Sequence, residues 1–370
     1  MSETIYIRPI GFAPGPQSEE GDAVRLAGGL VYASRFAVIY RRNGEVVERW
    51  RASRETIAQV LGQLPDSVAA EAETQWTNLR MAHPALELGA RTVRLDQPQV
   101  MGILNVTPDS FSDGGKHVGD PAGTRDAIAA MVEAGASIVD IGGESTRPGA
   151  EAVWEEEEIR RIVPAVEAAA SMGAAVSIDT RRAGTMEAAL KAGAGIVNDV
   201  SALRYDPRSA ELVAKTGCPV VLMHAPGSGN DLHEGGAYDS VVLDVFDALR
   251  ERRDAAVAAG ISREKILLDP GLGFGKSLSD NLALINALPL FHALGQPILF
   301  GASRKRMIGA LSKEAAADAR LGGSIALALA AMDAGAQLLR VHDVPETVQA
   351  RDVWRGLRDA ALTDFADLPG

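Results

Sequence analysis

The sequence predicts an α/β protein: a (β/α)8 barrel preceded by a small N-terminal α+β extension. Apolar strand candidates alternate with helical stretches eight times between residues 99 and 361, which fits the ~250 residues of such a barrel. The tripeptide Ala-Gly-Ala recurs at 134–136, 192–194 and 334–336, where a helix has to end and turn back into a strand. A doubly wound open sheet is the rival fold, but no GxGxxG follows the first strand.

Residues 1–95 form the extension and read differently from the rest. We expect strands over 23–32 and 36–50, the second folded around the hairpin signal Asn43-Gly44. A helical stretch starts at Ser53, and Asp66 is placed to cap a second helix over 67–81. Residues 83–97 read as a linker. No motif assigns a role to the extension, so packing or oligomer contact is expected.

Residues 96–370 form the barrel domain, in which each strand is followed by a helix. The expected strands are 100–105, 137–141, 175–179, 196–198, 219–223, 266–269, 297–300 and 337–341. The expected helices are 121–134, 155–172, 183–192, 207–215, 240–259, 279–288, 315–334 and 345–361. Four glutamates at 155–158 suit the first turn of a helix, where the dipole favours acids.

Composition narrows the function classes. The apolar fraction is 46% and the charged fraction 23%, as in ordinary globular proteins. A net charge of −12 argues against a nucleic-acid surface. No apolar run reaches the ~18 residues of a membrane span, and no signal peptide is recognisable at the N-terminus. Cys218 is the only cysteine, which excludes a disulfide within the chain and predicts a cytoplasmic location.

Polar side chains follow every predicted strand, more often than helix capping explains. They include Asn105, Asp140, Asp179, Asn198, His224, Asp269, Ser303 with Lys305, and Arg340 with His342. The carboxyl ends of barrel strands meet on one face, so these groups are expected to converge. Cations suited to a diphosphate are Arg147, Lys305, Arg340 and His342. Asp179, Asn198 and Asp269 suit the edge of a guanidine-like heterocycle, with Met223 and Phe274 as an apolar wall.

These motifs resemble those of the dihydropteroate synthase family. The matching runs are 101–115, 140–149, 178–180, 198–199, 223–224, 269–276, 303–305 with 307–309, and 340–344. The resemblance implies condensation of 6-hydroxymethyl-7,8-dihydropterin diphosphate with p-aminobenzoate, giving dihydropteroate and pyrophosphate in folate biosynthesis. It also implies a homodimer and small-molecule partners only.

The resemblance assigns roles to residues of this chain. The pterin would be bound by Asp179, Asn198, Met223, Asp269, Phe274, Lys305 and Arg340. The p-aminobenzoate pocket would contain Phe111, Thr146, Arg147, Pro148, Phe274 and Lys305. The diphosphate would be bound by Asn105, Thr146, Arg147, Ser303, Arg340 and His342, with Asn105 helping to hold Mg²⁺. The catalytic groups would be Arg147, Lys305, Arg340, His342 and Asp179. Loops 107–117 and 143–151 are expected to close over the site.

Three positions depart from the family pattern and leave the pocket shape open: Ala225-Pro226, Leu272 and Arg306. The retained Gly-Phe-Gly-Lys run at 273–276 resembles sulfonamide-sensitive members. Two alternatives stay open, a pterin-binding methyltransferase and a non-catalytic pterin-binding paralogue. Outside the motifs, Asp231, His233 and Glu234 are expected to lie in a solvated loop. Trp154 and Trp354 are expected to pack between helices, and Cys218 is expected to be buried.

Overall fold

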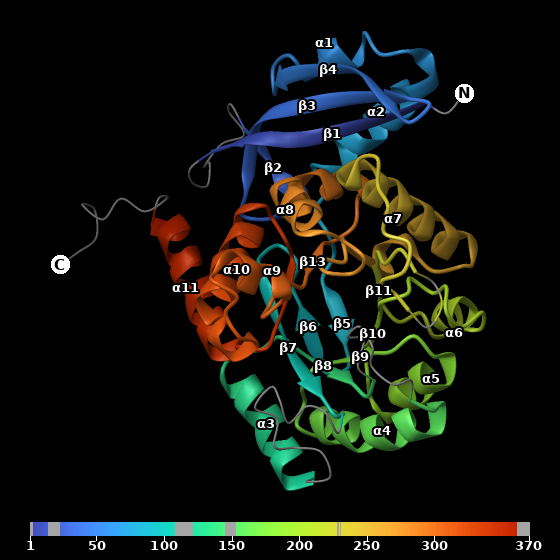
Figure 1. The fold of residues 1–370 in the computed structure, drawn as a ribbon, viewed down its shortest axis with the longest axis vertical. Coiled ribbons are helices and arrows are strands. Elements are labelled where there is room, and N and C mark those ends of the chain that lie inside the picture. The colour runs from blue at the N-terminus through green and yellow to red at the C-terminus, as the bar shows by residue number, and fades with distance from the viewer. Residues whose placement is uncertain are drawn as a thin grey trace, which may run out of the picture.

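The computed structural model describes residues 3–13, 23–107, 121–144, 153–227, 229 and 231–360. Eight parallel strands form one sheet in the order β12-β11-β10-β9-β8-β7-β14-β13 (Figure 1). A parallel bridge between Leu268 and Ile298 joins the two ends of this order, which closes the barrel as predicted. The strands are β7 (Gln99–Asn105), β8 (Ile138–Gly142), β9 (Val176–Asp179), β10 (Ile196–Asp199), β11 (Val220–Met223), β12 (Ile266–Asp269), β13 (Leu299–Phe300) and β14 (Leu338–Val341).

The helices surround the barrel close to the predicted positions. They are α3 (Pro121–Glu133), α4 (Glu155–Ser171), α5 (Ala183–Ala192), α6 (Ser209–Thr216), α7 (Val241–Ala258), α8 (Leu278–Asn286), α10 (Leu321–Asp333) and α11 (Val344–Ala360). Two short helices, the 3-10 helix η4 (Leu288–Leu294) and α9 (Arg306–Leu311), were not predicted. None of the helices in the described ranges is long and apolar enough to cross a membrane.

Glycine ends the helices that precede three of the strands. Gly135, Gly193 and Gly335 have φ of 96°, 117° and 86°, in the left-handed region that other residues rarely adopt. The repeated Ala-Gly-Ala therefore marks helix ends, as the sequence predicted.

A short hairpin seals the amino end of the barrel. It consists of β5 (Leu86–Leu88) and β6 (Arg91–Val93) and lies within residues 83–97, so the prediction of a plain linker is wrong. Its leucines and Val93 pack with one residue from the start of each barrel strand. Those residues are Met101, Ile138, Ala175, Ile196, Val221, Leu267, Leu299 and Leu338. The hairpin is a plug, which leaves the carboxyl ends of the strands as the open face.

The N-terminal sheet is antiparallel and contains β1 (Glu3–Phe12), β2 (Val24–Arg25), β3 (Tyr32–Arg42) and β4 (Glu45–Ser53). The hairpin at Asn43-Gly44 is confirmed, with φ of 51° and 85° at these two residues. Strand β1 was not predicted, and the strand expected over 23–32 is reduced to β2 and a 3-10 turn. Helices α1 (Ile57–Leu61) and α2 (Asp66–Asn78) follow; α2 starts after Pro65, so Asp66 is in its first turn and is not its cap.

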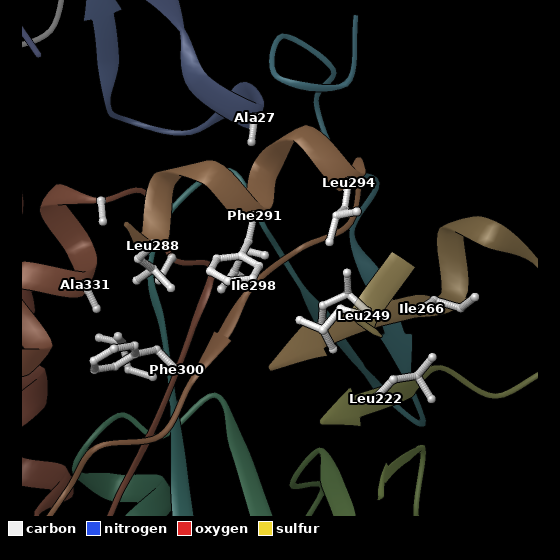
Figure 2. Close-up of a cluster of buried hydrophobic side chains, with 14 of the residues drawn as sticks. Ala27, Leu222, Leu249, Ile266, Leu288, Phe291, Leu294, Ile298, Phe300 and Ala331 are labelled. Atoms are coloured by element: carbon white, nitrogen blue, oxygen red, sulfur yellow. The ribbon is translucent and has the colours of Figure 1, made fainter. Parts of the chain in front are cut away.

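This sheet, with α1 and α2, is the N-terminal module, and it packs on η4 and α7. Ala27 lies above Leu288 and Phe291 of η4, and the cluster continues to the barrel residues Ile298 and Phe300 (Figure 2). The Tyr6 hydroxyl donates a 2.7 Å hydrogen bond to Asp247 of α7. Because η4 leads into the amino end of β13, the module lies away from the carboxyl ends of the strands (Figure 1).

The edge of β1 that does not pair with β3 is protected by side-chain hydrogen bonds and by a proline. The Gln75 side chain of α2 accepts a 2.9 Å hydrogen bond from the Ile7 N–H and donates a 2.6 Å bond to the Ile5 carbonyl. Residues that face this edge alternate, so the next one is Pro9, which has no N–H to offer. The edge therefore presents little to a further strand.

Candidate active site

Four barrel strands bring their charged ends together around Arg340 of β14. Its Nε donates to Asp140 of β8 and its Nη2 donates to Asp179 of β9, each over 2.6 Å. Asn198 of β10 donates to the same Asp140 oxygen over 3.3 Å. Asp140 is 0% exposed, and its other oxygen is buried without a hydrogen-bond partner among the residues that the structure describes. A polar ligand group at this point would satisfy that acceptor.

Asp140 and Asp179 share the guanidinium of Arg340 in this cluster. Burial raises the pKa of Asp179 to about 7; Arg340 opposes the rise and the nearby Asp140 adds to it. Burial disfavours the charge on Arg340, but Asp140 and Asp179 together raise its pKa above the usual value. The cluster therefore keeps a fixed cation beside a carboxyl group that can exchange a proton near neutral pH.

Asp269 of β12 and Lys305 after β13 influence each other electrostatically. Asp269 accepts a 2.7 Å hydrogen bond from the Gly271 N–H, and burial raises the pKa of this carboxyl. The Lys305 ammonium donates to the Leu272 carbonyl and lies 5.0 Å from the ring centroid of Phe274. Burial lowers the pKa of Lys305 to about 8, although Asp269 favours its charged form.

Lys276 holds the segment after β12 in place. Its Nζ lies 2.9 Å from His224 Nδ1 and donates to the carbonyls of Gly271, Phe274 and His224 over 2.8, 3.1 and 3.3 Å. Burial, followed by the charge on Lys276, lowers the pKa of His224 to about 3 and keeps the imidazole neutral as an acceptor. Lys276 thereby fixes the backbone on both sides of Phe274. No role was predicted for Lys276 from the sequence.

Residues after β11 form part of the apolar wall. The His233 ring stacks on Phe274 with centroids 5.1 Å apart and an interplanar angle of 14°. Asp231 and Glu234 are exposed, as expected for a solvated loop, whereas His233 is half-buried against Phe274. Leu232 between them is buried with Met223 and Ala225. Within the described ranges, no three His, Cys, Asp or Glu side chains are grouped as metal ligands.

The proposed diphosphate residues lie at the ends of β7, β13 and β14. His342 places its Nδ1 3.0 Å and its backbone N 3.2 Å from Ser303 Oγ. Asn105 ends β7, and a Cβ on Gly142 would lie 3.6 Å from Asn105 Oδ1 and 3.8 Å from Asp179 Oδ2. Both oxygens thus face the space above Gly142.

Not every predicted site residue can be placed. Phe111, Thr146, Arg147 and Pro148 lie outside the described residues, as does most of both loops expected to close. The structure brings together the other predicted residues of the strand ends, and it adds Asp140, Lys276, Arg304 and Asp343. Of the three departures from the family pattern, Ala225 and Leu272 are buried, whereas Arg306 is exposed at the start of α9.

A buried ion network lies beside this face. Glu144 binds Arg181 and Arg182 over 3.2 and 2.9 Å, and Arg182 binds Glu158 over 2.7 Å. Glu158 is 0% exposed, so it does more than favour the dipole of α4. Trp154 is 83% exposed, which contradicts its predicted packing between helices.

Trp354 and Cys218 are the other two residues outside the motifs for which burial was predicted. Trp354 is buried and donates a 2.8 Å hydrogen bond to Asp333, in agreement with the prediction. Cys218 is half-buried, less than predicted, and burial raises the pKa of its thiol above the usual value. A raised thiol pKa lowers the thiolate fraction, so this side chain is poorly suited to nucleophilic chemistry.

Most of the barrel domain matches a family of known proteins. The profile of the pterin binding enzymes matches residues 101–342. Dihydropteroate synthase of Escherichia coli K12 is 47% identical over 260 residues, 70% of this chain and 91% of that protein. Its counterpart from Neisseria meningitidis serogroup C is 44% identical over 282 residues, 75% of this chain and 99% of that protein.

Solved structures of dihydropteroate synthases are also similar to this chain. Xanthomonas albilineans dihydropteroate synthase with 4-aminobenzoic acid is 48% identical, with a TM-score of 0.68 over 75% of this chain and 99% of that one. The same enzyme in complex with 7,8-dihydropteroate is 45% identical, with a TM-score of 0.65 over 74% of this chain and 99% of that one. The strand ends that meet around Arg340 lie inside the matched region, and the chain belongs to the pterin binding enzyme family.

Proposed function

We propose that this protein is a dihydropteroate synthase, which joins a dihydropterin diphosphate to p-aminobenzoate and releases pyrophosphate in folate biosynthesis. Relatives of 42–47% identity bear that name, and related structures contain 4-aminobenzoic acid or dihydropteroate. The observation that carries the proposal is the meeting of two chemistries at one barrel face. Buried acids around Arg340 suit a heterocycle, and the Ser303–His342 pair suits an anion.

The pterin ring would lie between the buried acids and the wall of Met223 and Phe274. A carboxylate facing adjacent ring N–H groups makes two parallel hydrogen bonds, and Asp179 and Asp269 are the acids proposed for this. Asn198 supplies an amide, and Lys305 supplies an ammonium beside the Phe274 ring. Arg340 holds Asp179 in place through a 2.6 Å ion pair.

The diphosphate would bind the cations and donors at the ends of β7, β13 and β14. His342, Ser303 and Arg340 are proposed as its contacts, together with Thr146 and Arg147. Mg²⁺ fits the donors present, because this ion takes oxygen ligands and is often held by few protein groups plus substrate phosphates. Asn105 would hold it, and the ion would then offset the charge that develops on the leaving pyrophosphate.

The reaction breaks the bond between the pterin methylene carbon and the diphosphate oxygen. The arylamine nitrogen of p-aminobenzoate forms the new bond to that carbon and loses a proton, while the electron pair leaves with pyrophosphate. Arg147, His342 and Arg340 stabilise the departing charge, and Asp179 balances the positive charge on the ring. The arylamine is already a nucleophile, so no activated serine or cysteine is needed.

The p-aminobenzoate pocket is proposed to consist of Phe111, Thr146, Arg147, Pro148, Phe274 and Lys305. A related structure, that of Yersinia pestis dihydropteroate synthase, carries a sulfonamide drug. We expect sulfonamides to compete with p-aminobenzoate here. The methyltransferase and paralogue alternatives lose ground, because neither needs a paired Ser303–His342 anion site.

We further propose a homodimer and a cytoplasmic location. Helix α11 exposes Val353 and Leu357, at 59% and 72% of their surface. Val353 also lines a hollow of about 550 Å³ with Ala134, Pro345, Val348, Gln349 and Asp352. Burial of such side chains against a second copy is favourable. Sedimentation equilibrium would give twice the monomer mass, and Leu357→Asp would reduce it to the monomer.

The proposed function is tested by pyrophosphate release from the dihydropterin diphosphate with Mg²⁺, with and without p-aminobenzoate. Release should depend on p-aminobenzoate and fall at least about 100-fold in Lys305→Ala, as for removal of one electrostatic catalytic group. Lys191→Ala removes an exposed lysine of α5 and is the control with unchanged turnover. Tight pterin binding without release would favour the paralogue.

A further inference from the structure

We infer that Arg304 and Asp343 are positioning residues. Their ion pair joins the two strand-end segments that carry Ser303, Lys305 and His342, and holds these three groups in register. The inference rests on the proposed function and extends it to two residues that lie within the matching motifs but were given no role there or among the proposed contacts.

Two parallel links connect the segments after β13 and β14. In the first link, Ser303 Oγ lies 3.0 Å from His342 Nδ1 and 3.2 Å from the His342 backbone N. In the second link, one residue further along each segment, Arg304 donates to both Asp343 oxygens, with the Nε–Oδ2 distance at 3.1 Å. A planar guanidinium on a planar carboxylate resists twisting and sliding, so the second link fixes the geometry of the first.

The backbone of Arg304 adopts a conformation that requires support. Its φ is 58°, in the left-handed region that residues with a side chain rarely occupy. Support comes from α10 and the residue before it: the Arg304 N–H donates to Ser324 Oγ over 3.0 Å, and its carbonyl accepts from Arg320 over 2.8 Å. Such unusual backbone states are kept where surrounding contacts over-determine them, often at functional sites.

The left-handed backbone at Arg304 also lets the side chains of Ser303 and Lys305 point in different directions. Ser303 is directed to His342, whereas Lys305 reaches the Leu272 carbonyl beside Phe274. Arg304 between them is directed to Asp343. The pair is mostly shielded, with side-chain exposures of 22% for Arg304 and 13% for Asp343. A loosened pair would therefore displace an anion contact and a pterin contact together.

The test is a double-mutant cycle on inorganic pyrophosphate binding in the presence of Mg²⁺, measured by calorimetry on the full chain. Arg304→Met and Asp343→Asn should each weaken binding about tenfold, and the double variant should be no weaker than either single variant. Arg304→Lys should not restore binding, because an ammonium cannot bind both carboxylate oxygens in the same plane. In turnover, KM for the pterin diphosphate should rise more than KM for p-aminobenzoate.

Arg41→Met is the matched control, because it removes a 2.7 Å ion pair between Arg41 of the N-terminal module and Asp244 of α7. It should lower the melting temperature without changing the Kd of pyrophosphate. Unchanged Kd in Arg304→Met and Asp343→Asn, with a similar loss of melting temperature, would overturn the inference. Multiplying effects in the double variant would also overturn it, since Arg304 would then contact the anion directly.

Failure of the proposed function gives a different pattern. Wild-type protein that binds pyrophosphate but releases none from the pterin diphosphate would reject the synthase, while the binding cycle would still decide on the ion pair. Wild-type protein that binds no pyrophosphate would reject both.

Discussion

At the scale of single residues, Arg340 organises the open face of the barrel. It makes ion pairs of 2.6 Å with both Asp140 and Asp179, and the latter side chain remains 15% exposed. Removing one partner of a buried ion pair typically destabilises a protein by about 3–5 kcal/mol, because a charge stays behind without compensation. Substitution of Arg340 is therefore expected to lower protein stability as well as activity, so the two effects could not be separated. Substitution of Lys305 is the better test of the chemistry.

The lowered pKa of Lys305 predicts that enzyme activity depends on pH. Burial lowers the pKa of this ammonium to about 8, so its charged form is present below pH 8 and is lost as the pH rises through that value. We expect kcat/KM for the pterin diphosphate to fall about tenfold per pH unit above pH 8, as for loss of one required proton. The measurement is a pH profile of pyrophosphate release between pH 6 and 10, with the folded fraction followed by circular dichroism.

Lys305→Arg serves as the control, because a guanidinium stays charged over this range. Its residual activity should lack the alkaline limb. A wild-type profile that is flat to pH 9.5 would show that the charge of Lys305 is not needed.

Individual site residues were predictable where they directly follow a strand. Asp179, Asn198, Asp269 and Arg340 end strands, and their positions follow from the alternation of strands and helices. Lys276, Arg304 and Asp343 were missed because their partners are backbone carbonyls or residues distant in the chain. No local pattern encodes such partners. Asp140 was noted as a strand end but given no role, since strand register decides which end residues face Arg340.

At the scale of elements, α10 offers two adjacent glycines in different surroundings. Within the described part of the chain, a Cβ at Gly322 would meet nothing within 4 Å, whereas a Cβ at Gly323 would lie 2.2 Å from Ile308 Cγ2 of α9. Gly322→Ala should raise the free energy of unfolding by about 0.5 kcal/mol through reduced backbone entropy. Gly323→Ala should lower it by about 2 kcal/mol through overpacking.

Urea denaturation of the two variants measures this difference directly. Because the substitutions are identical and adjacent, helix propensity cancels between them. Equal effects would mean that α9 moves away from α10 without strain, and that packing at Ile308 is looser than the geometry indicates.

The long elements were predictable and the short ones were not. Helices such as α4 and α7 carry enough periodic apolar positions to be recognised within one or two residues of their ends. Helices η4 and α9 and the hairpin of β5 and β6 span only 3–7 residues per element. Their sequences form these elements because buried neighbours select the conformation, which a short window cannot reveal. Strand β1 was missed because Pro9 and Gly11 interrupt its apolar pattern.

At the scale of the whole molecule, the N-terminal module packs on η4 and α7, away from the carboxyl ends of the strands that form the site (Figure 1). Tyr6 joins the module to α7 through the hydrogen bond to Asp247 and an edge contact with Phe246, with centroids 5.3 Å apart. Tyr6→Phe should lower the free energy of unfolding by about 1 kcal/mol, the usual contribution of one hydrogen bond. Tyr6→Ala should lower it by about 4 kcal/mol.

Neither variant should change kcat/KM when assayed well below its melting temperature. Thermal unfolding and pyrophosphate release together test this separation. A fall in kcat/KM without a loss of stability would show that the module communicates with the open face.

The count of barrel units was predictable from the chain, but the placement of the module was not. Its docking depends on contact between Ala27, in the 3-10 turn Leu26–Gly28, and η4, and on the hydrogen bond from Arg41 to Asp244. These contacts join segments more than two hundred residues apart. The boundary predicted at residue 95 also divides the chain after the plug, although Leu86 and Leu88 pack with residues of the barrel strands. The alternation of strand and helix patterns gives the number of βα units, but it does not show which surface of the barrel another part of the chain will cover.

The closed edge of β1 bears on how this protein is made. Gln75 follows Ile7 by 68 residues, so the ribosome exposes β1 well before its protecting amide exists. At about 5–20 residues per second, that interval is on the order of ten seconds at the slow end. During it, neighbouring nascent chains on one messenger RNA can pair through this strand, and Pro9 is the protection already in place. We therefore expect substitution of Pro9 to lower the yield of newly synthesised protein, and substitution of Gln75 to increase association of the folded protein during storage.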